Sequence, residues 1–180
     1  MDKVLLHCCC APCSAAIVEW MLQAGIRPTL FYYNPNIFPQ AEYDIRKNEL
    51  TRHATALGLD VIDGDYDHAA WLCQVGNGRE TDSERGPRCL ACFRMRLRRT
   101  AEEAAARGFD TIATTLASSR WKSLEQIEAA GNWAVEPFEG VSFWAKNWRK
   151  DGLQQRRSEL LKAYGFYNQR YCGCEYSMRE

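Results

Sequence analysis

The chain has 180 residues, enough for one domain with a substantial hydrophobic core. Its 23 basic residues are balanced by 23 acidic residues, so the net charge excludes a general polyanion-binding protein. No apolar run approaches the roughly 18 residues of a membrane span, and no export segment precedes the first apolar run. We therefore expect a cytoplasmic protein without a membrane partner.

Apolar runs punctuated by Gly and Pro predict strands that alternate with helices along the chain. The predicted strands are residues 3–7, 28–33, 60–63 and 110–114. The predicted helices are 14–24, 40–57, a brief one at 66–73, 88–107, one that ends near Ala130, and 153–164. Ser118 or Ser119 is the expected N-cap of the helix that ends near Ala130. A polar loop is expected at 74–87 and aromatic-rich irregular structure at 133–150.

This alternation predicts a single α/β domain over residues 1–180, with a mostly parallel sheet and helices on both of its faces. Residues 133–180 are expected to form an aromatic and basic C-terminal extension packed on that domain. Ligands of such sheets bind at the carboxyl ends of the strands. No glycine lies between His7 and Gly25 to form a phosphate-binding loop after the first strand, so ATP binding is not expected.

Cysteine is the most informative residue type of this chain. Seven of the nine cysteines fall in three clusters, which are Cys9, Cys10 and Cys13, then Cys89 and Cys92, then Cys172 and Cys174. An odd number of cysteines argues against a secreted disulfide framework, and in a reducing cytosol clustered thiols indicate metal binding or redox chemistry. Cys8 and Cys73 are expected to be buried apolar side chains.

The first two clusters have the spacing of metal ligands. Cys89 and Cys92 are three residues apart at the start of a helix, where they share one face and where the helix dipole lowers thiol pKa values. With two thiolates from the first cluster they would satisfy a [4Fe–4S] cluster. A structural zinc site is the alternative, and the adjacent cysteines of the first cluster favour iron.

Cys172-Gly173-Cys174 has a different spacing. A disulfide across one glycine would be strained and easily reduced, which is typical of a redox-active pair. The alternative is that both thiols are further metal ligands.

Basic and aromatic residues flank the thiol clusters. Arg94, Arg96, Arg98 and Arg99 follow the second cluster, and the tail carries Lys146, Trp148, Arg149, Arg157 and Tyr167 among others. Cations for phosphates and aromatic rings for stacking suit a single-stranded RNA loop. The alternative is an ordinary solvated helix face.

Several motifs together resemble the QueH type of epoxyqueuosine reductase. They are His7-x-Cys9-Cys10-Ala11-Pro12-Cys13, Tyr33-Asn34-Pro35-Asn36-Ile37 with Glu42-Tyr43 and Arg46, Cys89-x-x-Cys92, Thr114-Thr115-Leu116, and Tyr171-Cys172-Gly173-Cys174-x-Tyr176-Ser177. The resemblance covers nearly the whole chain. It implies an adenine-nucleotide α-hydrolase-like (HUP, Rossmann-like) fold and a cobalamin-independent reduction of epoxyqueuosine to queuosine at the wobble position of tRNA.

The resemblance also implies roles for particular residues. Cys9, Cys10, Cys89 and Cys92 correspond to the ligands of a [4Fe–4S] cluster, Cys172 and Cys174 to a redox-active pair, and Cys13 to a candidate ligand of a second, mononuclear iron. The candidate substrate-binding residues are Asn34, Asn36, Tyr43, Arg46, Arg94 and Arg98. The chain departs from the family pattern at Cys8, where an apolar residue is usual, and at Asn147, where an aspartate is expected.

Reduction of an epoxide to an alkene needs two electrons and two protons and releases water. The expected partner is tRNA that carries epoxyqueuosine, together with an electron donor that the sequence does not identify. Tyr33, Tyr43 and His7 are the candidate proton donors. The alternative function is a zinc-stapled RNA-binding module without catalysis; a tRNA-thiolating enzyme is disfavoured, because the chain lacks an SGGxDS-like ATP loop.

Overall fold

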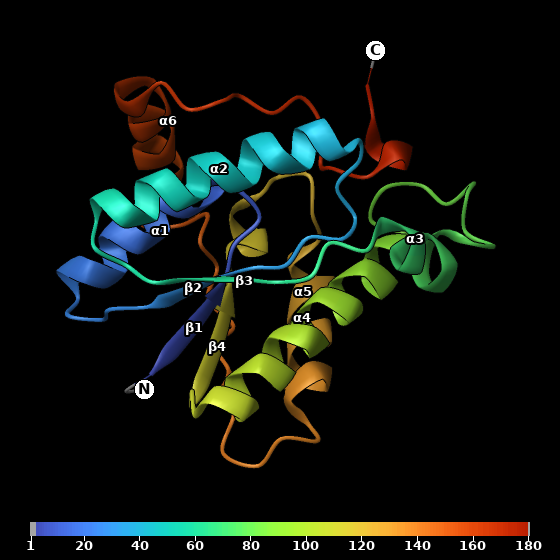
Figure 1. The fold of residues 1–180 in the computed structure, drawn as a ribbon, viewed down its shortest axis with the longest axis horizontal. Coiled ribbons are helices and arrows are strands. Elements are labelled where there is room, and N and C mark those ends of the chain that lie inside the picture. Colours follow the sequence, from blue (N-terminus) through green and yellow to red (C-terminus); the bar gives the residue numbers. More distant parts are fainter. Residues whose placement is uncertain (1–2, 180) are drawn as a thin grey trace.

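The computed structural model describes residues 3–179 and is built on one parallel sheet. The strand order is β3-β2-β1-β4-β5, and every neighbouring pair is parallel (Figure 1). The strands are β1 (Val4–His7), β2 (Thr29–Tyr32), β3 (Val61–Asp63), β4 (Thr111–Thr114) and β5 (Ser142–Phe143). The central strands β1 and β4 are buried along their whole length, as expected for a sheet covered on both faces.

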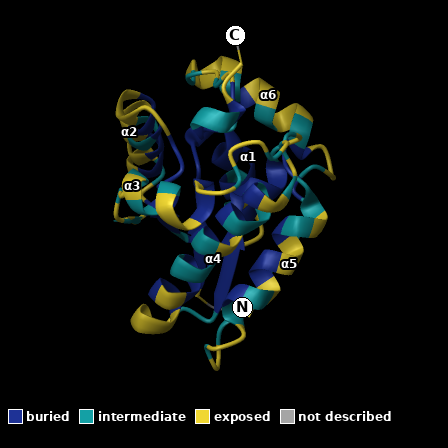
Figure 2. Cartoon of the chain, turned by 90° about the vertical axis from the view of Figure 1, so that its right-hand side faces the viewer, coloured by how far each residue is buried: buried dark blue, intermediate teal, exposed yellow. Residues whose placement is uncertain are grey.

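Helices cover both faces of the sheet. On one face lie α1 (Ala11–Gln23), α2 (Gln40–Ala56) and α6 (Leu153–Tyr164); on the other lie α4 (Pro87–Arg107) and α5 (Leu124–Val135) (Figure 1). Short elements complete the chain, namely α3 (His68–Trp71), η1 (Leu72–Gly76), η2 (Thr115–Ser118) and η3 (Glu175–Ser177). The helices bury the sides that face the sheet and expose the others (Figure 2). The predicted α/β fold with a parallel sheet is confirmed.

Two predicted helix starts are wrong, and in both cases a side chain caps the helix elsewhere. Helix α1 begins at Ala11 instead of residue 14, because the Cys10 thiol accepts a hydrogen bond from the Cys13 amide and serves as N-cap. Helix α5 begins at Leu124, because Ser123 is its N-cap and Ser118 belongs to the preceding turn η2. The short strand β5 was also not predicted; it lies within the segment expected to be irregular.

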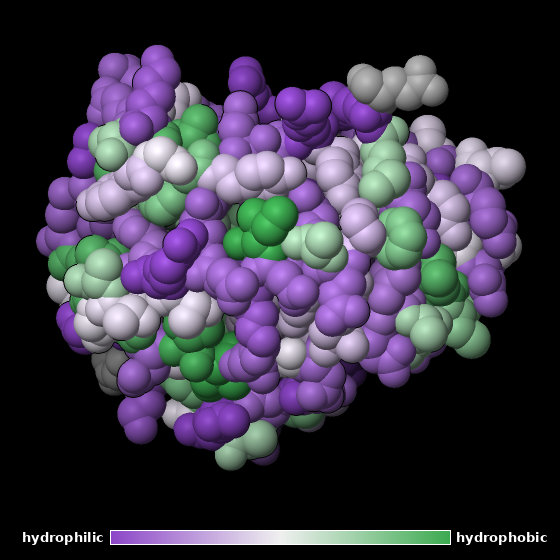
Figure 3. Space-filling model, turned by 45° about the horizontal axis from the view of Figure 1, so that its top comes forward, coloured by the Kyte–Doolittle hydropathy of each residue, from purple (hydrophilic) through white to green (hydrophobic). Residues whose placement is uncertain are grey.

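On the face shown in Figure 3 hydrophilic side chains predominate, and the apolar ones form small separate groups. Among the described residues, no helix is both long and apolar enough to span a membrane.

Candidate metal and redox site

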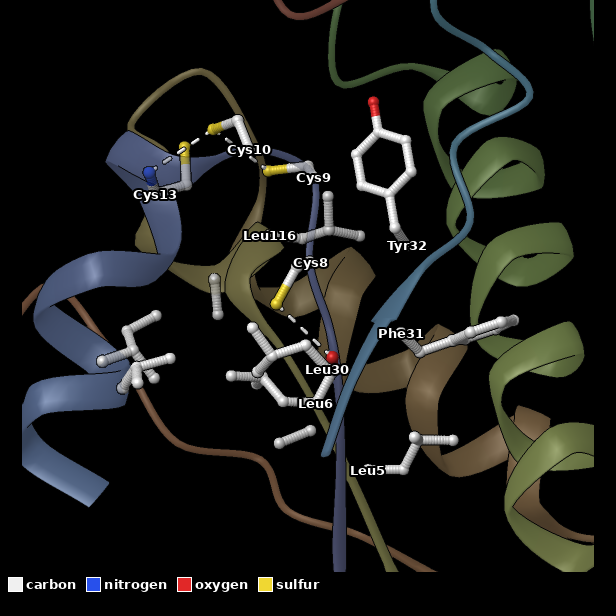
Figure 4. Close-up of a cluster of buried hydrophobic side chains, with 14 of the residues drawn as sticks. Leu5, Leu6, Cys8, Cys9, Cys10, Cys13, Leu30, Phe31, Tyr32 and Leu116 are labelled. Carbon is white, nitrogen blue, oxygen red and sulfur yellow. Dashed lines mark hydrogen bonds between the residues drawn. The ribbon is translucent and has the colours of Figure 1, made fainter. Parts of the chain in front are cut away.

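The first cysteine cluster lies where β1 ends and α1 begins, at the carboxyl edge of the sheet. The sulfur atoms of Cys9, Cys10 and Cys13 all lie within 4.8 Å of one another, and all three residues are buried. The Cys9 and Cys10 sulfurs are 3.7 Å apart. In Figure 4 these three side chains point toward one another, whereas Cys8 points the other way, toward the Leu6 carbonyl. The prediction that Cys8 is a buried apolar side chain is confirmed.

The three thiols of this cluster differ in acidity because they share hydrogen bonds in a buried place. Hydrogen bonds from Cys10 and Cys13 hold the pKa of Cys9 well below its ordinary value, and the positive charges of Lys122 and Arg96 act in the same direction. Burial raises the pKa of Cys10. A buried thiol whose pKa is lowered, beside other thiols and nearby cations, is an environment that suits a metal cation.

The second cluster lies in the first turns of α4. The indole Nε1–H of Trp71 donates to the Cys92 sulfur at 3.3 Å, and the guanidinium of Arg96 lies 4.0 Å from the same sulfur. The backbone N–H of Arg85 donates to the Cys89 sulfur at 3.3 Å. Burial raises the pKa of both thiols. The hydrogen bonds from Trp71 and Arg85 to the two sulfurs are typical of the surroundings of cysteines that bind a metal.

The third cluster connects the first two. Cys172 lines the same pocket as Cys9 and Cys13, and it also interacts electrostatically with Cys89 and Cys92. Burial, together with the neighbouring Cys172, raises the pKa of Cys174 to about 11. All of these cysteines are free thiols in this structure. Segments 80 residues and more apart in the sequence thus meet at one edge of the sheet.

Helix α2 holds the turn that carries Cys172 and Cys174 through hydrogen bonds to its backbone. The Arg46 guanidinium donates to the carbonyls of Cys172 and Tyr171 at 2.9 and 3.2 Å and pairs with Glu42 on its own helix. The backbone N–H of Phe38 donates to the Gly173 carbonyl at 2.9 Å. These contacts fix the backbone of the turn and leave its thiols on the side of the other clusters.

The donor set fits a thiolate-bound metal centre. Cys9, Cys10 and Cys13 can hold a metal ion with little movement, since their sulfurs are already close and buried. The cations Arg96 and Lys122 would offset part of the negative charge of thiolate ligands. Thiolate ligands alone suit zinc and iron–sulfur centres alike, so the donor atoms select soft-metal chemistry without fixing the metal.

An open pocket gives access to this site; we call it the thiol pocket. It has a volume of about 220 Å³ and is lined by Cys9, Cys13, Ser118, Ser119, Arg120, Trp121, Lys122, Gln154, Arg157, Asn168, Gln169 and Cys172. No carboxylate is among these described residues. The pocket thus combines thiols with cations, and its wall is formed by the loop that follows η2, by α6 and by the C-terminal segment.

Four predicted substrate-binding residues lie in the interior beside this pocket. Asn34, Asn36, Tyr43 and Arg46 are all buried, and none of them lines the thiol pocket. Asn34 donates to the Cys8 carbonyl and accepts from Arg96, so it orients the first cluster's turn. The Asn36 side-chain oxygen is buried without a hydrogen-bond partner among the described residues.

The other two predicted substrate-binding residues lie in a second, larger pocket on α4. This arginine pocket has a volume of about 620 Å³ and is lined by Tyr33, Gln74, Val75, Arg79, Pro87, Leu90, Ala91, Arg94, Met95, Arg98, Arg99, Glu102 and Trp133. The guanidinium groups of Arg98 and Arg94 lie 3.8 and 5.3 Å from the centre of the Trp133 ring. The pocket thus offers four arginines, and two of them lie against one indole.

The predicted proton donors do not reach the thiol pocket. His7 is fully buried and bonds to Thr114 and to the Tyr33 carbonyl, and burial together with Arg96 lowers its pKa to about 3. Tyr33 lines the arginine pocket, and Tyr43 is stacked on Tyr66 with 3.9 Å between ring centres. The neutral His7 ring therefore cross-links the ends of β1 and β4.

Two further findings differ from the sequence analysis. Cys73 is exposed and not part of the core, because the chain forms the π-helical turn η1 there. Lys122 and Arg157 line the thiol pocket, although the patterns we used gave no role to Lys122. The position of Lys122 in the loop after β4, beside the strand that precedes the first cysteines, is the signal that could have identified it.

Comparisons with known proteins identify the family of this chain. A family model described as "Epoxyqueuosine reductase QueH" matches residues 4–180. The epoxyqueuosine reductase QueH of Haemophilus influenzae is 46% identical over 99% of this chain and 73% of its own length. The proteins of the same name from Acinetobacter baylyi and Thermotoga maritima are 45% and 37% identical, over 82% and 92% of their lengths. Because the match extends along nearly the whole sequence, this chain belongs to the epoxyqueuosine reductase QueH family of oxidoreductases.

Proposed function

We propose that this chain reduces the epoxide of epoxyqueuosine in tRNA, at the wobble position, to the alkene of queuosine. The observation that carries the proposal is the thiol pocket at the sheet edge, which Cys172 lines together with Cys9 and Cys13 of the buried first cluster. Membership of the family supports the reaction. A tRNA substrate makes the cytoplasm the place of action.

The cysteines divide into ligands and a redox pair. In this proposal Cys9, Cys10, Cys89 and Cys92 hold a [4Fe–4S] cluster, and Cys13 is a ligand of a second iron. When bound, such a centre supplies electrons and a Lewis acid. The chain itself orients these ligands, through the Trp71 donor to Cys92 and the Arg85 amide to Cys89.

Cys172 and Cys174 supply the two-electron step. Two thiols that become one disulfide release two electrons and two protons, and these convert the epoxide into an alkene and water. Both carbon–oxygen bonds of the epoxide break, and the oxygen leaves with both protons. An external reductant of the thiol or iron–sulfur class then restores the dithiol.

The cations of the two pockets suit a nucleic-acid substrate. Arg120 and Arg157 line the thiol pocket, and the arginine pocket places Arg94 over the Trp133 ring. Guanidinium groups bind phosphates, and an indole stacks on unpaired bases. We propose the arginine pocket as a contact for the anticodon arm.

The test is reduction of epoxyqueuosine in tRNA by anaerobically purified protein, with mass spectrometry of the digested nucleosides. We expect a brown protein with bound iron and sulfide, and loss of one oxygen from the substrate nucleoside. A colourless zinc protein that binds tRNA without converting it would contradict the proposal and support an RNA-binding module.

Cysteine variants test the ligand assignment. Cys9→Ala, Cys10→Ala, Cys89→Ala and Cys92→Ala should each lose iron and sulfide, whereas Cys172→Ser and Cys174→Ser should keep both and lose turnover. Exposed Cys73→Ala is the matched control and should behave as wild type. Loss of the whole cluster in Cys13→Ala would move Cys13 into the cluster's ligand set.

A further inference from the structure

Gln169 brings an unused hydrogen-bond donor to the thiol pocket. Its side-chain nitrogen Nε2 is buried and has no hydrogen-bond partner within residues 3–179, and the residue lines the pocket beside Cys172. In the part of the chain that the structure describes, no other residue of this pocket has a buried side-chain atom without a partner. A buried amide N–H without an acceptor is unfavourable, so its place in an open pocket indicates that a ligand supplies the acceptor.

A second amide in the thiol pocket is oriented by the protein itself. The side-chain nitrogen of Gln154 donates to the Ser118 carbonyl at 2.7 Å, and its side-chain oxygen remains as an acceptor. Gln169 and Gln154 thus give the pocket one uncharged donor and one uncharged acceptor. The edge of a nucleobase offers both acceptors and donors, whereas a phosphate offers acceptors only. The two amides therefore suit a base.

Trp121 adds a partly exposed indole to the same pocket. The backbone of this residue is held on both sides, because Arg85 donates to its carbonyl at 3.3 Å and its amide donates to the Ser119 hydroxyl at 3.3 Å. The Arg179 guanidinium lies 5.1 Å from the centre of the ring. A fixed indole beside hydrogen-bonding amides is the usual surroundings of a base that has been turned out of its stack.

We propose that the thiol pocket binds the wobble base, turned out of the anticodon loop, and that Gln169 donates a hydrogen bond to its carbonyl oxygen O6. The inference rests on the proposed function, in which the base is a 7-deazaguanine whose C7 arm carries the epoxide. O6 and the C7 arm lie on the same edge of that base. A donor to O6 that lines the pocket beside Cys172 therefore leaves the epoxide arm next to the thiols.

A hydrogen bond to O6 makes the site selective among purine-type bases. Guanine-type bases have a carbonyl acceptor at position 6, whereas adenine has an amino donor there. A base without the oxygen leaves the Gln169 amide unpaired, and a 6-amino base sets two donors against each other. Sites built around such a hydrogen bond discriminate well, because the wrong ligand leaves their buried polar groups without partners. Gln169 is thus a residue that determines specificity.

The first test changes one atom of the ligand and uses the anaerobically purified protein with its metal centre. The probes are anticodon stem-loops that carry either 7-deazaguanosine or its analogue with hydrogen in place of O6 at the wobble position. Fluorescence anisotropy gives the Kd of each. We expect loss of O6 to raise the Kd of the wild-type protein by about 2–12-fold, as the loss of one net hydrogen bond does. Equal Kd values would overturn the assignment, and this result depends on no variant.

Variants separate recognition of O6 from general support of the pocket. In Gln169→Met the two stem-loops should bind with equal Kd values, whereas Trp121→Leu should weaken both and keep the preference for O6. Gln169→Glu replaces the donor by an acceptor and should favour a stem-loop with an amino group at position 6. Gln155→Met, on the exposed side of α6, is the matched control and should keep the wild-type preference. A persistent preference for O6 in Gln169→Met would contradict the inference.

Failure of the proposed function gives a different result from failure of this inference. Wild-type protein that reduces epoxyqueuosine in tRNA but shows no preference for O6 would overturn the inference alone. Wild-type protein that prefers O6, loses this preference in Gln169→Met and never reduces epoxyqueuosine would support the base site and contradict the proposed reaction. Wild-type protein that binds neither stem-loop would overturn both.

Discussion

Gly173 is the residue on which the position of the redox pair depends. It lies between Cys172 and Cys174 with φ +146°, a backbone conformation that residues with a side chain rarely adopt. A Cβ atom at this position would lie 3.1 Å from both Asn36 Nδ2 and Ile37 Cγ1 and 3.3 Å from Arg46 Nη1. The substitution Gly173→Ala therefore introduces backbone strain and crowding against three buried neighbours.

The destabilisation of the turn by Gly173→Ala is the sum of backbone strain and crowding. Strain of this kind costs about 1–3 kcal/mol, and crowding in a packed interior adds about 1–3 kcal/mol. The turn is docked by one hydrogen bond from the Phe38 amide and two from the Arg46 guanidinium to its carbonyls, which contribute about 0.5–1.5 kcal/mol and about 1.5–3 kcal/mol each, respectively. Because the penalty is of the same order as that docking energy, we expect the turn to detach more often while the sheet remains folded.

The assay is the rate at which a thiol reagent labels Cys172 and Cys174 in the reduced protein, measured beside thermal unfolding. Gly173→Ala should label about tenfold faster or more and lose reductase activity, with a small change in Tm. Gly165→Ala is the matched control, since its φ is +63° and nothing lies within 4 Å of the added Cβ. Gly165→Ala should show the effect of backbone strain without that of crowding. Equal labelling rates in the two variants would refute the argument from crowding.

Three further predictions follow from single contacts. Arg94→Gln should lower the slope of log K for tRNA against log salt by about one, and an unchanged slope would exclude a phosphate contact. Trp71→Phe should keep the iron but shift the midpoint potential of the centre to a more negative value in a redox titration, because it removes the hydrogen bond to the Cys92 sulfur. Burial lowers the pKa of His53, so the unfolded chain takes up a proton there first and stability should fall as pH drops below about 6.5. In urea unfolding at pH 7.5 and 5.5, His53→Leu should show a smaller fall than wild type.

The fold was predictable from the sequence because its signals are local. The apolar run at Val4–His7 and the glycines that end helices, such as Gly108, each act within a few residues. Errors arose where a distant or unusual contact decides the boundary. A thiol caps α1, and β5 is two residues long and gains its place from pairing with β4. Neither a thiol N-cap nor a two-residue strand produces a hydrophobic periodicity in the sequence.

The cysteines of the candidate site stand out in the sequence, whereas Lys122 does not. Cysteine clusters are rare along a chain, but Lys122 is one of many charged residues, and only the folded structure places it in the thiol pocket. The same applies to Arg46, whose hydrogen bonds to the carbonyls of Tyr171 and Cys172 no sequence pattern indicates. The solvent exposure and the hydrogen-bond partners of a side chain decide such roles, and both are set only when the chain folds.

The sheet topology explains why thiols and a lysine meet at this place. In the order β3-β2-β1-β4-β5, the connections leave β1 and β4 toward opposite faces, so a crevice opens between the two strands at their carboxyl ends. The loop after β1 carries Cys9 and Cys10, and the loop after β4 carries Lys122. In this chain no glycine-rich loop follows β1, and Cys10 and Cys13 lie at the N-terminus of α1 beside that crevice. The crevice that could accept phosphates is thus lined in this chain by thiols and by cations.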